Sequence, residues 1–285
     1  MERYYRFAGI EIAVSMSEEL FYEQEYRLAP FRVNSMKDPH RFRFSLTEKL
    51  DPPKGTCLVE EPGFRIYKDG EEQIRYIGTV SRSWEEGYIR VSYQGKDHKV
   101  QVKASSVPDR IGTKTVLNSI GVEHLAARAG GFVFHCSYID HNGKAILFTA
   151  PSETGKSTQA ELWHNLRGAE IINGDRAAVR IAEGKAMAEG IPFAGSSEYC
   201  ENRSLPIEAI VYLGQAPKTT IRRMKGYEAF SRIWEGVSVY TWDRTDVELI
   251  SGAVQQIART VPIYHMPCTP DETAVVALEN ALNSR

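Results

Sequence analysis

The segment LFTAPSETGKSTQAELW, from Leu147 to Trp163, decides how the rest of the chain is interpreted. An apolar run leads into a short stretch of small and polar residues, and an amphipathic stretch follows. Residues 150–157 read APSETGKS, which matches the pattern G-x-x-x-x-G-K-[ST] at every position except the first. A strand, a loop of this composition and a helix, in this order, are typical of a phosphate-binding loop.

The last residues of this loop have the chemistry that a triphosphate requires. Gly155 permits a tight backbone turn, and the amides that open the next helix point at the anion. Lys156 is expected to neutralise the β- and γ-phosphates, and the hydroxyl of Ser157 to bind Mg²⁺. The pattern therefore predicts binding of ATP and Mg²⁺ by Ser152, Glu153, Thr154, Gly155, Lys156, Ser157 and Thr158.

Two residues of the loop depart from the pattern. Ala150 replaces the first glycine, which adds only one methyl group. Glu153 brings a carboxylate near the expected phosphates, and this costs affinity unless the side chain points to solvent or meets Mg²⁺ or a base. Because such loops hold the anion mainly through backbone amides, an outward-facing Glu153 is compatible with nucleotide binding.

An acidic residue follows the loop at the end of a second apolar strand. The segment AEIINGDRAAV delivers Asp175 at the end of that strand. Phosphoryl transfer uses a carboxylate near the metal ion or near the attacking hydroxyl. We therefore expect Asp175 to bind Mg²⁺ and to act in catalysis, while an ordinary turn aspartate after Gly174 is the alternative interpretation.

The order of these features resembles a known family. From Gly131 to Val179 the chain contains a strand with His135, an Asn-Gly hairpin, the phosphate loop, a helix and the strand that ends at Asp175. This resembles the HPr kinase/phosphorylase-like (serine kinase-like) family of the phosphoenolpyruvate-carboxykinase-like fold. The resemblance covers about residues 112–280. It implies that a hairpin feeds directly into the phosphate loop and that His135 supports the active site by orienting or tuning Asp175.

The chain departs from this family at two positions. The family usually has glycine at the position of Glu153, and it often has paired aspartates where this chain has Gly174 and Asp175. Losing one carboxylate separates the roles of metal ligand and general base, or leaves one of them unfilled. The segment after the second strand resembles kinase-like relatives, and its candidates for contact with a phosphate or an acceptor are Ser196, Ser197 and Arg203. The candidates for stabilising the transition state are Arg176 and Arg203.

The chain is predicted to contain two domains. Residues 1–110 are β-rich, with hairpins expected around Lys68-Asp69-Gly70 and Gln94-Gly95-Lys96-Asp97. Residues 111–285 mix strands and helices, which indicates an α/β (α+β mixed) domain that carries the phosphate loop. Before the loop, the segment KTVLNSIGVEHLAARAGG predicts one amphipathic helix, in which His124 has a structural or surface role.

Composition excludes several classes of protein. The formal charge of −2 over 285 residues gives no long-range attraction to nucleic acid or to an anionic membrane. The four cysteines are far apart and form no C-x-x-C pair, which argues against a zinc site or a disulfide framework. No stretch approaches the roughly 20 apolar residues of a membrane span, and the first residues lack the pattern of a signal peptide. We therefore expect a cytoplasmic protein.

The leading functional hypothesis is an ATP-dependent phosphotransferase. Its acceptor would be a hydroxyl, either on a serine or threonine of a peptide or protein or on a small hydroxylated molecule. Lys156 and the loop amides would hold the phosphates, and Ser157 with Asp175 would place Mg²⁺. Asp175 or its neighbourhood would accept the hydroxyl proton, with His135 orienting or tuning that carboxylate. The sequence leaves open whether the chain forms a homo-oligomer and whether it catalyses the reverse phosphorylase reaction.

Two other hypotheses remain. Glu153 and the single Asp175 are also compatible with a non-catalytic nucleotide-binding partner protein in a peptide-modification or regulatory system. The β-rich part would then be its interaction module. A carboxykinase-like enzyme is the weaker alternative, because that chemistry needs further metal ligands and an oxaloacetate site, for which the sequence has no convincing residues.

Overall fold

The computed structural model of the chain has a mixed α/β fold and two compact units. The first unit comprises Met1–Arg6 and Ile10–Gly121, and the second comprises Phe7–Gly9 and Val122–Arg285. The structure describes residues 1–17, 27–79, 83–106, 113–195 and 197–284. The boundary expected near residue 110 thus lies outside the described residues.

The segment expected to form one helix before the phosphate loop forms two. Helix α1 (Thr113–Ile120) and helix α2 (Val122–Arg128) are separated by Gly121. Gly121 has φ 65°, a left-handed conformation that ends a helix and that glycine adopts without steric cost. Helix α1 belongs to the first unit, where the hydroxyl of Tyr93 donates a hydrogen bond of 2.8 Å to the carbonyl of Ser119. The two units therefore divide after Gly121.

In the described part of the chain, the first unit is built on a nine-stranded sheet with the order β3-β1-β2-β4-β9-β8-β7-β6-β5. The strands are β1 (Glu2–Phe7), β2 (Ile10–Ser15), β3 (Arg32–Val33), β4 (His40–Thr47), β5 (Thr56–Glu61), β6 (Gly63–Asp69), β7 (Glu72–Thr79), β8 (Ile89–Gln94) and β9 (Asp97–Lys103). Short 3-10 turns cover Ala29–Phe31, Trp84–Glu86 and Ala104–Ser106.

Both hairpins expected in this unit form, as β6–β7 and β8–β9. Asp69 pairs with Glu72, so the first turn consists of Gly70 and Glu71 and is one residue shorter than expected. Gly70 has φ 60° and Gly95, in the second turn, has φ 54°. Glycine at these positions allows the tight turns that match the twist of the strands.

The second unit contains the phosphate loop. Its strands are β10 (Gly131–His135), β11 (Ser137–His141), β12 (Lys144–Thr149), β13 (Glu170–Asn173), β14 (Arg176–Ala182), β15 (Lys185–Glu189), β16 (Ser204–Gln215), β17 (Arg222–Met224), β18 (Val237–Ser238) and β19 (Ile263–Cys268). Its further helices are α3 (Lys156–Arg167), α4 (Gly226–Trp234), α5 (Arg244–Thr260) and α6 (Glu272–Asn283). The sheet has the order β13-β11-β12-β16-β15-β14-β10-β18, and β19 also pairs with β16 and carries β17 on its other side.

Four strands of this sheet run in the same direction. β12 is parallel to β16, and β16 is parallel to β19. β13 has the same direction as β12, because both are antiparallel to β11, which lies between them. The carboxyl ends of these four strands therefore meet at one edge of the sheet, where ligands bind in open α/β sheets.

The strand expected over FVFHCSYI is interrupted at Cys136. Its first half, β10, pairs with β14 and β18, whereas its second half, β11, pairs with β12 and β13. Only β11 forms the hairpin that leads into the phosphate loop. Asn142 and Gly143 make its turn with φ values of 57° and 77°, as the Asn-Gly pair predicts.

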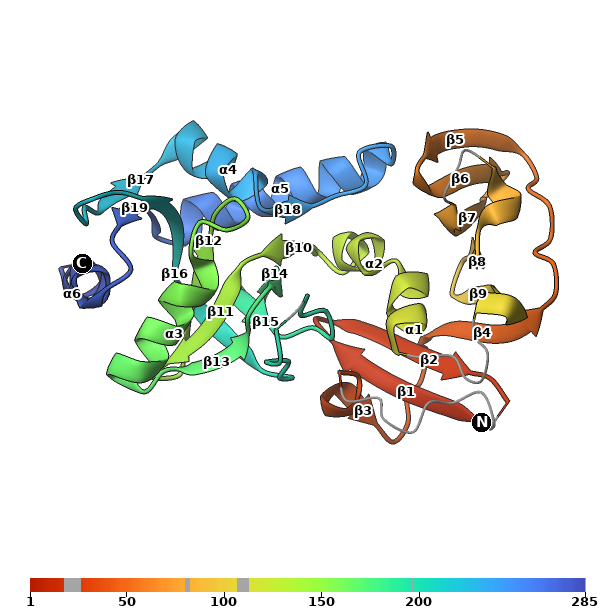
Figure 1. Ribbon diagram of the computed structural model, residues 1–285, viewed down its shortest axis with the longest axis horizontal. Helices are drawn as coiled ribbons and strands as arrows, with labels where there is room; N and C mark the ends of the chain where they lie inside the picture. The colour runs from red at the N-terminus through yellow and green to blue at the C-terminus, as the bar shows by residue number, and fades with distance from the viewer. Residues whose placement is uncertain (18–26, 80–82, 107–112, 196, 285) are drawn as a thin grey trace. The chain divides into compact units, whose positions relative to one another are not determined.

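Helices cover both faces of the sheet around β12. Alternate side chains of β12 point to opposite faces, as the pleat of a strand requires. Ile146 and Phe148 are buried in a core that includes Trp163 of α3 and residues of α6. Ala145 and Leu147 are buried in a second core with residues of α2, α4 and α5. Figure 1 shows α4 and α5 along the upper side of this unit and α3 below them. Of the helices in the described residues, none is both long and apolar enough to cross a lipid bilayer.

Replacing Trp163 by alanine is expected to destabilise the second unit strongly. Trp163 is fully buried between α3 and the sheet, with its ring 4.9 Å from the ring of His141. Removing so large a buried side chain costs about 3–5 kcal/mol of unfolding free energy. Urea unfolding, monitored by circular dichroism, measures this loss of unfolding free energy. The control is Leu166→Ala on the exposed side of the same helix, and equal losses in both variants would contradict the described core.

Candidate functional site

The loop between β12 and α3 has the backbone shape of an anion-binding loop. Glu153 and Gly155 have left-handed conformations, with φ values of 63° and 114°. Gly155 is the N-terminal cap of α3 and makes no side-chain hydrogen bond to the first helical turn. Because the first amides of a helix have no intrahelical partner and lie at its positive end, they favour a bound anion here.

The exposure of the Glu153 side chain, and not its backbone conformation, explains why a carboxylate is tolerated at this position. A left-handed conformation suits glycine and costs another residue about 1 kcal/mol or more. The side chain of Glu153 is exposed, so its carboxylate lies at the surface. Its carbonyl accepts a hydrogen bond of 3.4 Å from Nε2 of Gln215, the last residue of β16. Glu153 therefore has a backbone conformation that suits glycine, while its charge lies at the surface.

The side chain of Lys156 lies against the start of the loop. Its Nζ donates hydrogen bonds to the carbonyls of Ala150 at 3.2 Å and Pro151 at 3.4 Å, and the residue is 8% exposed. Burial lowers the pKa of Lys156, while the negative charge of Asp175 opposes this change. A phosphate anion would supply the further negative charge that a partly buried ammonium favours. Of the remaining loop residues, Thr154 is half-buried and Ser152, Ser157 and Thr158 are exposed.

Asp175 lies between a histidine and an arginine. Its Oδ1 is 3.4 Å from Nε2 of His135, and its Oδ2 is 3.2 Å from Nε of Arg176. The hydrogen bond from His135 lowers the pKa of Asp175 below 3.8, against the opposing effect of burial, and Arg176 lowers it further. Asp175 is therefore a carboxylate at neutral pH. Such an anionic oxygen suits a hard cation such as Mg²⁺.

Hydrogen bonds to backbone carbonyls connect Asp175, His135 and the end of β12. The amide of Cys136 donates a hydrogen bond of 3.0 Å to the carbonyl of Asp175. The hydroxyl of Ser137 donates a hydrogen bond of 3.0 Å to the carbonyl of Gly174. At the end of β12, the hydroxyl of Thr149 donates to the carbonyl of His135 at 3.0 Å. The structure thus brings His135, Asp175 and the start of the loop together at one edge of the sheet.

Asn173 is a site residue that the sequence analysis missed. It is fully buried, and its Oδ1 accepts hydrogen bonds from the amides of Asp175 at 3.0 Å and Arg176 at 2.9 Å. Its Nδ2 donates to the carbonyls of Ile191 at 3.1 Å and Phe193 at 3.0 Å. Asn173 therefore holds the turn that carries Asp175. An asparagine before Gly-Asp is a turn signal that could have indicated this role.

The structure gives a steric reason for the missing second carboxylate. A side chain at Gly174 would collide with the side chain of Ser197. On the other side of the turn, a Cβ at Gly195 would lie 2.7 Å from Cγ of Asp175. The segment around residue 195 therefore packs directly against the carboxylate turn. Ser197 is close to this turn, whereas Ser196 lies outside the described residues.

Arg203 lies away from the phosphate loop. Its Nη1 is 3.0 Å from Oδ2 of Asp140 and also contacts the carboxylate of Glu170. Asp140 and Glu170 pair across β11 and β13 near the Asn-Gly turn, at the end of these strands opposite to Asp175. The expectation that Arg203 contacts a phosphate or the transition state is therefore wrong. Of the two arginine candidates, only Arg176 lies beside Asp175.

A pocket of about 590 Å³ adjoins the phosphate loop on the side of β16 and β19. Residues 153–155 and Thr158 form one wall of this pocket. The remaining lining residues were not found from the sequence, because they are far apart along the chain: Gln159, Leu213, Gln215, Ala216, Cys268 and Pro270.

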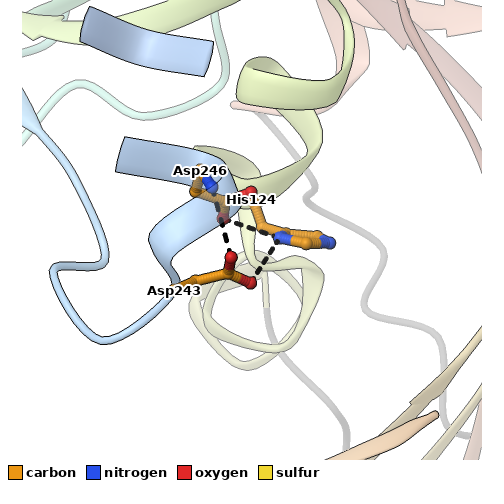
Figure 2. A group of neighbouring side chains, drawn as sticks. All are labelled: His124, Asp243 and Asp246. Atoms are coloured by element: carbon orange, nitrogen blue, oxygen red, sulfur yellow. Dashed lines mark hydrogen bonds and ion pairs between the residues drawn. The ribbon is translucent and has the colours of Figure 1, made fainter. Parts of the chain in front are cut away.

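A second cluster of charged side chains connects α2 to α5 (Figure 2). Nδ1 of His124 is 2.7 Å from Oδ2 of Asp246 and 3.9 Å from Oδ2 of Asp243. Nε of Arg128 is 3.3 Å from the other oxygen of Asp246, which is 1% exposed. A histidine and an arginine thus surround one buried carboxylate.

This donor set resembles a metal site, but its contacts favour a structural role. Asp243 caps α5 by accepting hydrogen bonds from the amides of Thr245 at 3.0 Å and Asp246 at 3.2 Å. The guanidinium of Arg128 is already in contact with Asp246, where it would repel a cation. We therefore interpret the cluster as an ion-pair network that fixes the start of α5 against α2.

The comparisons with known proteins add little to this geometry. No protein-family model matches the chain, and no curated protein matches it. A solved structure that the chain resembles is that of the Hpr(Ser) kinase/phosphatase from Coxiella burnetii. The TM-score is 0.34 with 10% sequence identity, over 53% of this chain and 91% of that chain. Nothing about activity follows from a similarity at this level.

Replacing Glu153 tests whether the loop needs a left-handed residue at this position. We expect Glu153→Gly to be more stable than Glu153→Ala by about 1 kcal/mol, because only glycine adopts φ 63° without strain. Thermal unfolding of the two variants measures the difference. The matched control is the same pair at Glu161, an exposed position inside α3, where alanine should be the more stable by about 1 kcal/mol. Equal stability of the two variants at position 153 would contradict the described loop.

Neutralising Asp246 tests the structural interpretation of the second cluster. Asp246→Asn keeps the shape of the side chain but leaves His124 and Arg128 without their common anion. We expect a loss of about 1–3 kcal/mol in urea unfolding. Glu248→Gln, in an exposed ion pair of the same helix, should leave the midpoint of urea unfolding unchanged. A midpoint that rises when Mn²⁺ or Zn²⁺ is added to the wild type would instead indicate a metal site.

Proposed function

We propose that the chain is an ATP-dependent phosphotransferase that phosphorylates a hydroxyl group. The observation that supports this best is the meeting of two parts at one edge of the sheet. One part is an anion-binding loop with Lys156 at the start of its helix, and the other is the carboxylate of Asp175 paired with His135. Phosphoryl transfer depends mainly on positioning and charge neutralisation, which such a set of residues provides.

In this proposal the loop binds the phosphates of ATP. The backbone amides at the start of α3 donate hydrogen bonds to the phosphate oxygens, and Lys156 moves from the loop carbonyls to the phosphates. The hydroxyl of Ser157 and the carboxylate of Asp175 are hard oxygen donors, which fit Mg²⁺. Bound Mg²⁺ would neutralise part of the phosphate charge. The HPr-kinase-like arrangement of this domain, over residues 111–285, is part of the same proposal.

The acceptor hydroxyl is activated next to Asp175. Its oxygen attacks the γ-phosphorus, the bond to the bridging oxygen of ADP breaks, and ADP leaves with the electron pair. Asp175 accepts the proton of the hydroxyl, while His135 holds the carboxylate in place. Because the pKa of Asp175 is lowered, it is a weak base, so that most of its contribution comes from orientation and charge. Arg176, beside the same carboxylate, is the candidate for stabilising the transition state.

The acceptor in this proposal is a serine or threonine of a peptide or protein, or a small hydroxylated molecule. The β-rich first part, residues 1–110, would contribute to its recognition. A non-catalytic nucleotide-binding partner protein is the second candidate. It is favoured by the packing of Ser197 against Gly174, which leaves a single carboxylate at the end of β13.

Substitution of Lys156 and Asp175 separates these candidates. We expect Lys156→Ala to lose Mg-ATP binding, because it removes the cation of the phosphate loop. Asp175→Asn should lower transfer by about a hundredfold or more, because it removes the carboxylate but keeps the shape. Calorimetry measures binding, and radiolabelled transfer from ATP to a library of serine- and threonine-containing peptides measures activity.

Lys185→Ala, at the exposed first position of β15, serves as the control and should keep both Mg-ATP binding and transfer. Near-normal transfer by Lys156→Ala or by Asp175→Asn would exclude the proposed roles. Binding of Mg-ATP by the wild type without transfer to any peptide or small hydroxylated acceptor would favour the non-catalytic candidate.

A further inference from the structure

We propose that the pocket beside the phosphate loop binds the base of the nucleotide, and that Gln159 selects a purine with an exocyclic amino group, as in adenine. We call this pocket, lined by residues 153–155 and by Thr158, Gln159, Leu213, Gln215, Ala216, Cys268 and Pro270, the base pocket. The inference rests on the proposed function, because it needs a nucleotide whose phosphates occupy the loop.

The first argument is the position of the base pocket along the sheet. Between β13 and β19 the strands follow the order β13-β11-β12-β16-β19. The phosphate loop follows β12, Asp175 follows β13 on one side of it, and the base pocket lies at the ends of β16 and β19 on the other side. A nucleotide held by the loop can therefore place its terminal phosphate toward Asp175 and its base in the pocket.

The second argument is the size and the chemistry of the walls. A volume of about 590 Å³ is within the range of small-molecule sites. Leu213 and Cys268 are buried, at 1% and 9% exposure, and Ala216 and Pro270 add further apolar surface. Burial raises the pKa of the Cys268 thiol, so this wall is uncharged at neutral pH. Apolar walls of this kind suit the flat face of a base, and among the described residues the one charged residue that lines the pocket is Glu153, whose side chain is exposed.

The third argument is the side chain of Gln159. It is 2% exposed, and its Nε2 donates to Sγ of Cys268 at 3.5 Å. Its Oε1 has no hydrogen-bond partner among the described residues. A buried acceptor without a partner is unfavourable, and the terminal torsion of a glutamine rotates easily. An exocyclic N–H of a base in the pocket would satisfy this oxygen after a small rotation of the amide.

The test compares ATP with two ligands that lack increasingly large parts of it. Mg-ATP has phosphates, base and exocyclic amine; Mg-purine riboside triphosphate lacks only the amine; Mg-tripolyphosphate has no base or sugar. Each is titrated by calorimetry into the wild type, into Gln159→Met, which keeps the side-chain volume, and into Gln255→Met. Gln255 is an exposed glutamine of α5 and provides the matched control.

We expect the wild type and Gln255→Met to bind ATP roughly tenfold more tightly than purine riboside triphosphate, because only ATP satisfies the buried oxygen. Gln159→Met should bind the two nucleotides equally and tripolyphosphate as the wild type does. A second variant, Ala216→Trp, narrows the pocket without changing Gln159. It should weaken ATP binding and leave tripolyphosphate binding unchanged.

The outcomes separate this inference from the proposed function. If the wild type binds all three ligands equally, or if Gln159→Met keeps the preference for ATP, the inference that this pocket binds the base is wrong. The proposed binding of phosphates by the loop is unaffected by that outcome. If ATP binds normally to Ala216→Trp, the base lies elsewhere. If the wild type binds none of the three ligands, the proposed function fails and this inference fails with it.

Discussion

The shared direction of β12, β13, β16 and β19 brings the loop at residues 150–157 and Asp175 to one edge of the sheet. Because these strands end at one edge of the sheet, the phosphate loop, the Asp175 turn and the base pocket are neighbours although they are far apart in the sequence. The hairpin between β11 and β12 is what permits this arrangement. It reverses the chain directly before the loop, so that β11 can pair with β13 on its other side.

Charge balance connects the parts of the site. Lys156 is partly buried, which lowers its pKa, and the carboxylate of Asp175 is the main anion that opposes this effect. Asp175 in turn stays ionised because His135 and Arg176 lie against it. A bound phosphate would add negative charge on the side of Lys156. Removing the charge of Asp175 is therefore expected to lower the pKa of Lys156 further.

Glu153 and Gly174 are the two positions at which the sequence departs from the family that it resembles, and the two departures have different physical consequences. Glu153 occupies a backbone position that suits glycine, and the cost is conformational, because the carboxylate itself is exposed. Gly174 occupies a position where Ser197 leaves no room for a side chain. The first departure thus concerns the stability of the loop. The second removes a carboxylate from the site, so that Asp175 would have to act alone.

The sequence by itself determined the local features of this protein. The loop at residues 150–157, the turn at Asn142-Gly143 and the strand that ends at Asp175 each follow from patterns within a few consecutive residues. Only the tertiary structure decided the rest: the interruption at Cys136, the ion pairs that hold Arg203 away from the loop, and the pocket beside Gln159. These features depend on contacts between distant segments, which turn signals and hydrophobic periodicity do not encode.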